Sequence, residues 1–255
     1  MELTLQMFLI VCPLVFLAGL VDSIAGGGGL ISLPAYILAG LPPHFAIGTN
    51  KLSSAIGTTV STVRYCKNKF VDWGVAIPSI FLALIGSAIG ANIALLMSEN
   101  VMKYILIIIL PVIAFYVLKG RTIKQDALED AIPRKKVYLI ACLASFFVGA
   151  YDGFYGPGTG SFLILIYTGL AKMDIKKAAG NTKLVNLASN VAALVTFLIN
   201  GKIFFILGIT AAVFSVAGNY IGSGLVIKNG HKVIRPIILV VLALLFIKVI
   251  TSGNS

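Results

Sequence analysis

The sequence predicts an all-α integral membrane protein made of two inverted-topology repeats of about five apolar segments each, with broken or re-entrant helices at two glycine clusters. Three observations support this prediction. The 255 residues are 58% hydrophobic and only 11% charged, whereas an ordinary soluble domain carries about 25% charged residues. Motifs in the first half recur in the second, and basic residues concentrate in alternate loops. So few charges could hardly cover a water-facing surface, which indicates a polytopic membrane protein.

The composition also argues against several classes of function. The net charge is +11, but the basic residues form short clusters between apolar runs, as cytoplasmic membrane loops do, so no nucleic-acid partner is expected. Three cysteines form no CxxC pair, and His44 and His231 are isolated in the sequence. We therefore expect no disulfide framework, no metal site and no bound cofactor.

Ten apolar segments follow one another along the chain. The first lacks a basic flank and a cleavage site, so we expect a retained helix rather than a removed signal peptide. A polar stretch, 119–136, is predicted as a cytoplasmic linker between a first transmembrane repeat, 1–118, and a second, 137–255. Two segments, 73–97 and 203–227, comfortably exceed the roughly 20 residues that a spanning helix needs. The predicted segments are 3–22, 28–40, 50–63, 73–97, 101–118, 137–153, 158–171, 183–199, 203–227 and 233–250.

Three sequence blocks recur in the two halves in the same order. Two of the three pairs are offset by 132 residues, and the third pair sets an aspartate before a glycine cluster in each half. Chance similarity between apolar segments is a poor explanation for three ordered matches. The matched blocks are VDSIAGGGG (21–29) with YDGFYGPGTG (151–160), AIGTNKL (46–52) with AAGNTKL (178–184), and GSAIGAN (86–92) with GNYIGSG (218–224).

The lysines and arginines are distributed unevenly over the loops. If the segments alternate and the N-terminus lies outside, the inward loops hold 15 basic residues and the outward loops hold two, Lys103 and Lys202. The positive-inside rule then places both termini outside. Because each half has an odd number of segments, the halves would be inverted relative to one another, as is typical of secondary transporters. A re-entrant first pair in each half keeps this parity, so six to ten crossings fit the sequence.

The two glycine clusters predict interruptions between short helices. Backbone that is not helical survives at membrane depth only where it is buried in protein or lines a wet cavity. The helix after each interruption would point its positive end back at it, and an anion is the natural occupant. Close helix packing is the alternative explanation, and we assign it to the GxxxG pairs Gly86/Gly90 and Gly218/Gly222. The candidate binding residues in the clusters are Gly26, Gly27, Gly28, Gly29, Gly156, Gly158 and Thr159.

A lysine lies near the start of an otherwise uncharged segment in each half. Lys51 and Lys183 would be costly in the membrane and are therefore candidates to bind an anion; the alternative is that each side chain extends to the nearby interface. The polar neighbours Asn50, Asn181, Thr182 and Asn186 complete the predicted site. Further polar residues recur at helical spacing on the same segments, namely Ser53, Ser54, Thr58, Ser189 and Asn190.

Asp22 and Asp152 precede the two glycine clusters in corresponding positions. Two acids and two lysines cancel in formal charge. Each aspartate could form an ion pair with a lysine, cap the helix after the interruption, or take up a proton during transport. The sequence leaves these alternatives open.

These residues resemble the signatures of the TauE/SafE family of sulfite-exporter-like membrane proteins. The similarity lies in DSIAGGGGLISLPAYILAGLPPHFAIGTNKL and in YDGFYGPGTGSFLILI followed by AAGNTKLVNLASN, and it extends from about residue 14 to 250. The resemblance implies a bacterial inner-membrane permease for small anions, with sulfite and organosulfonates the substrates proposed for named members. The second repeat departs from the first, because GPGTG replaces GGGG and Asn–Thr replaces Thr–Asn. The family pattern falls on Gly26 to Gly29, Asn50, Lys51, Gly156, Gly158, Asn181 and Lys183.

The sequence therefore predicts a secondary-type transporter of a small anion, driven by a gradient, and the family resemblance implies the bacterial inner membrane. Sulfite, an organosulfonate or another sulfur-containing anion would be the substrate, the lipid bilayer the surroundings, and a homodimer is compatible with the chain. An anion channel is the main alternative. A membrane-embedded enzyme is a weaker one, because no HExxH or GxSxG motif occurs, and we predict that the protein is not an enzyme.

Overall fold

A computed structural model describes residues 3–98, 101, 132–230, 232–234, 236–238 and 240. Within these ranges the regular structure is helical throughout, as predicted. Five of the helices, α1, α4, α6, α8 and α9, are long and apolar enough to cross a membrane. The helix bounds are α1 Leu5–Ala25, α2 Gly29–Leu38, α3 Pro43–Lys67, α4 Trp73–Leu96, α6 Arg134–Phe154, α7 Thr159–Gly169, α8 Ile175–Ile199 and α9 Phe205–Asn229.

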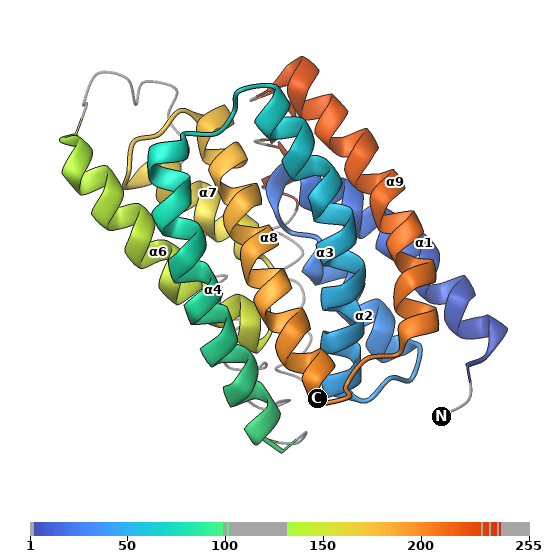
Figure 1. The fold of residues 1–255 in the computed structure, drawn as a ribbon. Coiled ribbons are helices and arrows are strands. Elements are labelled where there is room, and N and C mark those ends of the chain that lie inside the picture. The colour runs from blue at the N-terminus through green and yellow to red at the C-terminus, as the bar shows by residue number, and fades with distance from the viewer. Residues whose placement is uncertain are drawn as a thin grey trace.

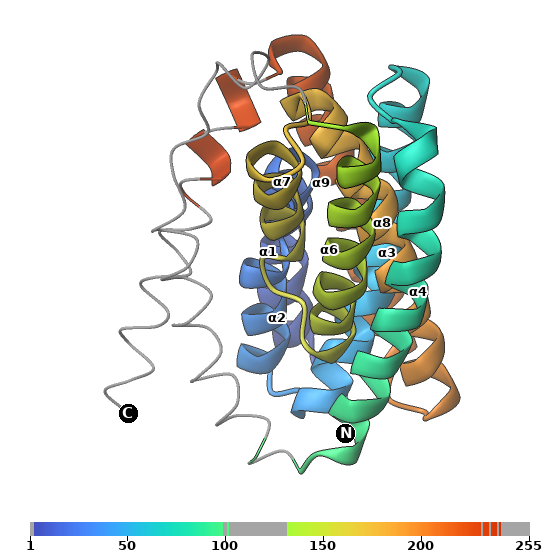
Figure 2. The ribbon, with the colours of Figure 1, turned by 90° about the vertical axis from the view of Figure 1, so that its left-hand side faces the viewer.

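Two flanking pairs of helices surround a central pair (Figure 1). Helices α3 and α8 contact each other in the middle, α1 packs with α9 on one side, and α4 packs with α6 on the other. The short helices α2 and α7 pack on α1 and α6 respectively, and Figure 2 shows them at different heights of one layer. Each flanking pair thus combines one helix from the first half of the chain with one from the second.

The central position of α3 and α8 follows from the polar residues that both helices bury. Helix α3 is 25 residues long, yet it is too polar to count among the apolar candidate spans. Its buried residues include Thr49, Asn50, Lys51, Ser53 and Thr58. Polar groups in a bilayer must find partners inside the protein. The more apolar helices therefore lie around the polar ones and present large side chains outward, as Phe81 and Phe147 do at 63% and 65% exposure.

Glycines determine how closely the helices of each flanking pair approach one another. A Cβ added to Gly86 or Gly90 of α4 would collide with the α6 backbone, and one added to Gly218 or Gly222 of α9 would collide with the α1 backbone or with Ser23. Small residues let transmembrane helices approach until their backbones touch. The packing role predicted for both GxxxG pairs matches these contacts.

The basic loops between the described helices gather at one end of the bundle, the upper end in Figure 1. There the Lys177 ammonium donates to the carbonyl oxygens of Lys69 and Val71 at 2.9 and 3.2 Å, and Arg134 pairs with Asp72 at 3.3 Å. The sequence assigned all of the lysines and arginines in these contacts to inward loops or their ends. The side of the membrane that this end faces remains a prediction.

Some predicted bounds differ from the structure. Helices α3 and α8 begin at Pro43 and Ile175, about two turns before the predicted starts at 50 and 183. Pro43 occupies the first helical position of α3, and Asp174 caps α8 by accepting from the backbone N–H groups of Lys176 and Lys177. The predicted segment 101–118, nearly all of the linker 119–136 and most of the segment 233–250 lie outside the described residues.

We predict that Gly90→Ala destabilises the protein by about 1–3 kcal/mol, because the new methyl group would overlap the Ala150 carbonyl of α6. The matched control is Gly169→Ala, where the added Cβ would meet no atom within 4 Å apart from its chain neighbours and the backbone of its own helix. That change should be neutral or slightly stabilising. Thermal unfolding in detergent measures both, and equal melting temperatures for the two variants would contradict the packing described here.

Candidate functional site

The two glycine clusters meet at their backbones. The Gly160 N–H donates to the Gly26 carbonyl at 3.0 Å, and the Ser161 hydroxyl donates to the Ala25 carbonyl at 2.7 Å. A Cβ on either Gly26 or Gly160 would overlap the other residue's backbone, and Gly26 has a left-handed φ of 74°. The end of α1 therefore crosses the start of α7 at a point where only glycine fits.

The second cluster is shaped by two further left-handed glycines, Gly156 and Gly158, with φ of 97° and 83°. Tyr151 of α6 donates its hydroxyl to the Pro157 carbonyl at 2.8 Å, and Thr159 donates to the Gly156 carbonyl at 2.7 Å. These bonds fix the turn between α6 and α7. The backbone of this turn is thus held against α1 instead of continuing a helix.

Two ion pairs cross between the halves of the chain. The Lys51 ammonium of α3 lies 2.8 Å from the Asp152 carboxylate of α6, and the Lys183 ammonium of α8 lies 2.7 Å from the Asp22 carboxylate of α1. Lys183 also donates to the Asp22 backbone carbonyl. Each lysine therefore pairs with the aspartate of the opposite half, and ion pairing, one of the roles open for the acids, is present in this structure.

Both lysines lie inside the protein. The side chains of Lys51 and Lys183 are 2% and 1% exposed, and each lies about two turns inside its helix. The sequence left open that they reach the interface, and this alternative is wrong for the structure described. The reason is the early start of α3 and α8, which carries both lysines to the level of the glycine clusters.

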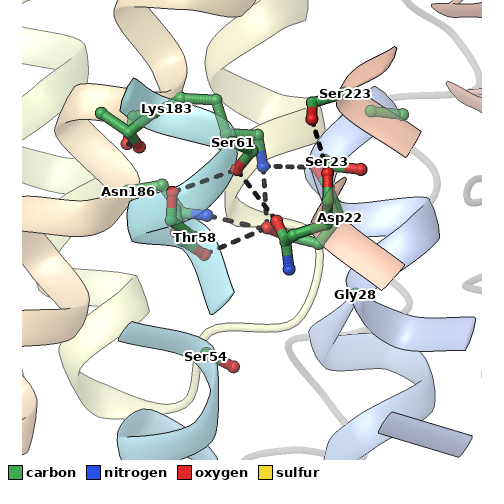
Figure 3. A network of polar contacts seen from close by, with 12 residues as sticks. Asp22, Ser23, Gly28, Ser54, Thr58, Ser61, Lys183, Asn186 and Ser223 are labelled. Carbon is green, nitrogen blue, oxygen red and sulfur yellow. Dashed lines mark hydrogen bonds and ion pairs between the residues drawn. The ribbon is translucent and has the colours of Figure 1, made fainter. Parts of the chain in front are cut away.

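Hydroxyl and amide groups complete the surroundings of the acids. Thr58 donates to Asp22 at 3.3 Å and Asn186 donates to it at 3.5 Å, as Figure 3 shows. Asp152 accepts from Ser189 at 2.6 Å and from Thr159 at 2.9 Å. Buried charges persist when such partners satisfy them.

A small cavity of about 30 Å³ lies between these groups. A cavity needs about 10–15 Å³ on this measure to hold one water molecule, so the space suits about two waters and is too small for a polyatomic anion. Of the predicted site residues, ten line the cavity: Asp22, Gly26, Gly28, Gly29, Asn50, Lys51, Asp152, Gly156, Thr159 and Asn186.

Five predicted residues do not line the cavity, namely Gly27, Gly158, Asn181, Thr182 and Lys183. Lys183 lies behind the Asp22 carboxylate, with which it pairs. Asn181 donates to the Lys177 carbonyl at 2.9 Å, while its Oδ1 and the Thr182 hydroxyl are buried without a hydrogen-bond partner. These two polar atoms are unsatisfied in this arrangement.

The structure adds lining residues that the sequence did not single out. Ser215 and Asn219 of α9 and Ser32 of α2 face the cavity, and Asn219 accepts from Ser61 at 2.9 Å. Asn219 lies in the second GxxxG block, where a polar residue in an apolar segment was the available signal. Within the described ranges, no group of three histidine, cysteine or acidic side chains could hold a metal ion.

Comparison with known proteins places the chain among membrane transporters. A family model described as Sulfite exporter TauE/SafE matches residues 11–249. The chain belongs to this family. No solved structure matches it.

Several relatives in this family are similar over most of their length. The chain is 35% identical to the "Probable membrane transporter protein YfcA" of Escherichia coli strain K12, over 94% of this chain and 88% of the relative. It is 34% identical to the "Probable membrane transporter protein ORF9" of Sinorhizobium sp, over 93% and 90%. A "Probable membrane transporter protein" of Haemophilus influenzae strain Rd is 32% identical, over 94% and 93%. The family predicted from the glycine and TNK signatures is thus confirmed.

We predict that the pairing partners can be told apart by double substitution. Lys51→Met or Asp152→Asn alone should destabilise the protein by about 3–5 kcal/mol, because each leaves an uncompensated buried charge. The double variant Lys51→Met/Asp152→Asn should be more stable than either single variant in thermal unfolding.

The control combines Lys51→Met with Asp22→Asn. This double variant also removes one positive and one negative charge, but it takes them from two different ion pairs. Its destabilisation should be at least the sum of the single effects. Recovery of stability in this control, and not in the first double variant, would mean that the lysines pair within their own halves.

Proposed function

We propose that this family member is a secondary transporter of a small anion, with sulfite and organosulfonates the first substrates to test. The observation that carries the proposal is the set of two lysines and two aspartates, one of each from either half of the chain. Asp22, Lys51 and Asp152 line a cavity beside the crossed glycine clusters, and Lys183 pairs with Asp22. Ionisable residues at membrane depth are costly, and they typically mark a substrate or ion pathway.

Anion recognition would combine two kinds of donor. The lysine ammonium groups supply positive charge, and the starts of α2 and α7 supply backbone N–H groups and the positive ends of the helix dipoles. Gly29 and Thr159, the first residues of these helices, both line the cavity. The names of the relatives describe a membrane transporter, and sulfite is named in the description of the family.

The two halves would act as inverted repeats. Helix contacts keep the same pattern when α1, α3 and α9 exchange with α6, α8 and α4, and Figure 1 shows α3 and α8 running in opposite directions. On this proposal residues 1–118 and 137–255 are the two repeats, joined by a linker over 119–136, and α1–α2 and α6–α7 are interrupted helices. Inverted repeats are the usual basis of alternating access around a central site.

A closed state fits the size of the cavity. A polyatomic anion needs more room than about 30 Å³, so binding requires helices to separate. Asn181 and Thr182, which carry the unsatisfied atoms, occupy the positions in the second repeat that correspond to Thr49 and Asn50 in the first. Asn50 lines the cavity. Opening on the opposite side would give these buried atoms water or substrate as partners.

We also propose a location and an assembly. The basic end of the bundle would face the cytoplasm of a bacterial inner membrane, which leaves both termini in the periplasm. A homodimer is compatible with the outward apolar faces of the flanking helices. Catalysis is not part of the proposal, since the family and relative names describe transport.

We predict that purified protein in proteoliposomes accumulates at least one of sulfite and methanesulfonate against its gradient, with sulfate and acetate as comparison anions. Uphill accumulation separates a transporter from a channel, which only dissipates gradients. Failure to move any of the four anions would reject the proposed function.

Lys51→Gln and Lys183→Gln should each weaken the apparent affinity for the transported anion by about 10- to 100-fold, the loss of one charged hydrogen bond. Lys228→Gln, at an exposed position near the end of α9, is the matched control and should transport as the unchanged protein does. Normal transport by both buried-lysine variants would contradict an anion site at these lysines.

A further inference from the structure

We propose that Asp22 takes up one proton for each monovalent anion that the protein moves, so that transport is an electroneutral cotransport of anion and proton. This inference rests on the proposed function and names the coupling ion and the residue that carries it. The two ion pairs are related by the sequence repeat, yet they differ in three respects that single out Asp22.

The first difference is exposure. The Asp22 side chain is 15% exposed, whereas that of Asp152 is 3% exposed. Both lysines are buried almost completely, at 1% and 2%. Of the four charged groups, Asp22 is therefore the one that water reaches most easily.

The second difference is how firmly each carboxylate is held. Asp152 accepts from Lys51 at 2.8 Å, from Ser189 at 2.6 Å and from Thr159 at 2.9 Å. Asp22 has one comparably short side-chain contact, to Lys183 at 2.7 Å, and two long ones, to Thr58 at 3.3 Å and Asn186 at 3.5 Å. Hydrogen bonds weaken towards such lengths, so the charge on Asp22 is the less stabilised by its neighbours.

The third difference is the position of the cavity. It extends along α1 and α9, where Val15, Ala18, Ser215 and Asn219 line it, and no described residue of α4 does so. The cavity thus lies on the Asp22 side of the central helices. Figure 3 shows Asp22 facing Lys183, Asn186 and Thr58, with Gly28 nearby.

An anion entering this cavity meets an unfavourable balance of charge. The charged lining groups within the described residues are two carboxylates, Asp22 and Asp152, and one ammonium, Lys51. A buried charge without a compensating partner costs several kcal/mol. Protonation of Asp22 removes one carboxylate and releases the Lys183 ammonium from its partner, so that it can bind the anion.

The charges then balance at each step. Before binding, Lys183 and Asp22 sum to zero; afterwards the ammonium and the monoanion sum to zero, and the proton resides on an Asp22 oxygen. The Lys51–Asp152 pair stays intact throughout. A dianion would leave an uncompensated charge, so the site favours monovalent species.

The neighbours of Asp22 are few and known. Helix α8 contributes Lys183. Helix α3 contributes Lys51, which lines the same cavity, and Tyr65, whose hydroxyl donates to the Ser23 carbonyl at 2.6 Å. Asp152 of α6 also lines the cavity. The cavity-lining residues of α2, α7 and α9 are glycine, hydroxyl and amide residues. Asp22 is accordingly the carboxylate best placed to exchange a proton with the cavity.

The test measures proton and anion movement together in proteoliposomes that contain a pH-sensitive dye. The probes are sulfite and methanesulfonate, and the second is a permanent monoanion that carries no proton of its own. The unchanged protein should move one proton with each methanesulfonate. A gradient of two pH units should sustain an accumulation of up to about 100-fold, a factor of ten for each unit.

Substitutions assign the proton to its residue. Asp22→Glu should keep the coupling of anion and proton movement. Any anion transport that remains in Asp22→Asn should carry no proton and should not be stimulated by acid. The anion concentration inside the proteoliposomes should then reach only about 1-fold that outside. Proton coupling that persists in Asp22→Asn would overturn the assignment, and the stoichiometry of the unchanged protein tests coupling even if that variant does not fold.

The outcomes separate this inference from the proposed function. If the protein moves neither of these anions and neither of the comparison anions sulfate and acetate, both the proposed function and this inference are rejected. If the unchanged protein moves either anion without a proton carried by the protein, this inference is rejected, while the proposed transport function is not. For sulfite, a proton that enters on bisulfite would still enter with Asp22→Asn, whereas a proton carried by Asp22 would not.

Discussion

Two buried lysine–aspartate pairs that cross between the halves of the chain are the constraint on which the structure depends. A charge at membrane depth persists only when it is paired and hydrogen-bonded. Lys51 pairs with Asp152 of α6, and Lys183 pairs with Asp22 of α1. Neither lysine is paired within its own half in this arrangement, so burial of the lysines of α3 and α8 requires both halves together.

The glycine clusters make this pairing geometrically feasible. Gly26 and Gly160 let α1 and α7 cross with their backbones in contact, which brings Asp22 and Asp152 close to the same cavity. The GxxxG glycines on α4 and α9 close the flanks around the central helices. Small residues thus serve two purposes, close packing on the flanks and an irregular backbone next to the charged site.

Much of this could be predicted from the sequence, because it depends on local pattern. The low charge content predicted the membrane class, and the glycine clusters with the TNK and NTK blocks predicted the family. Ten of the residues predicted for the site line the cavity, and five do not. The ion-pair partners could not be predicted, since matched residues in two repeats allow pairing within or between halves. The differences between Asp22 and Asp152 could not be predicted either, because they depend on tertiary packing. Residues of α9 such as Asn219 line the cavity only once α9 has packed beside α1.

The most direct measurement of the central claim is a cryo-electron microscopy structure in lipid nanodiscs, determined with and without a saturating concentration of a transported anion. Without the anion, Lys51 should contact Asp152 and Lys183 should contact Asp22. With it, density for the anion should lie between the glycine clusters and within hydrogen-bond reach of at least one of these lysines. Lysines paired within their own halves, or an anion bound away from both glycine clusters, would contradict the account.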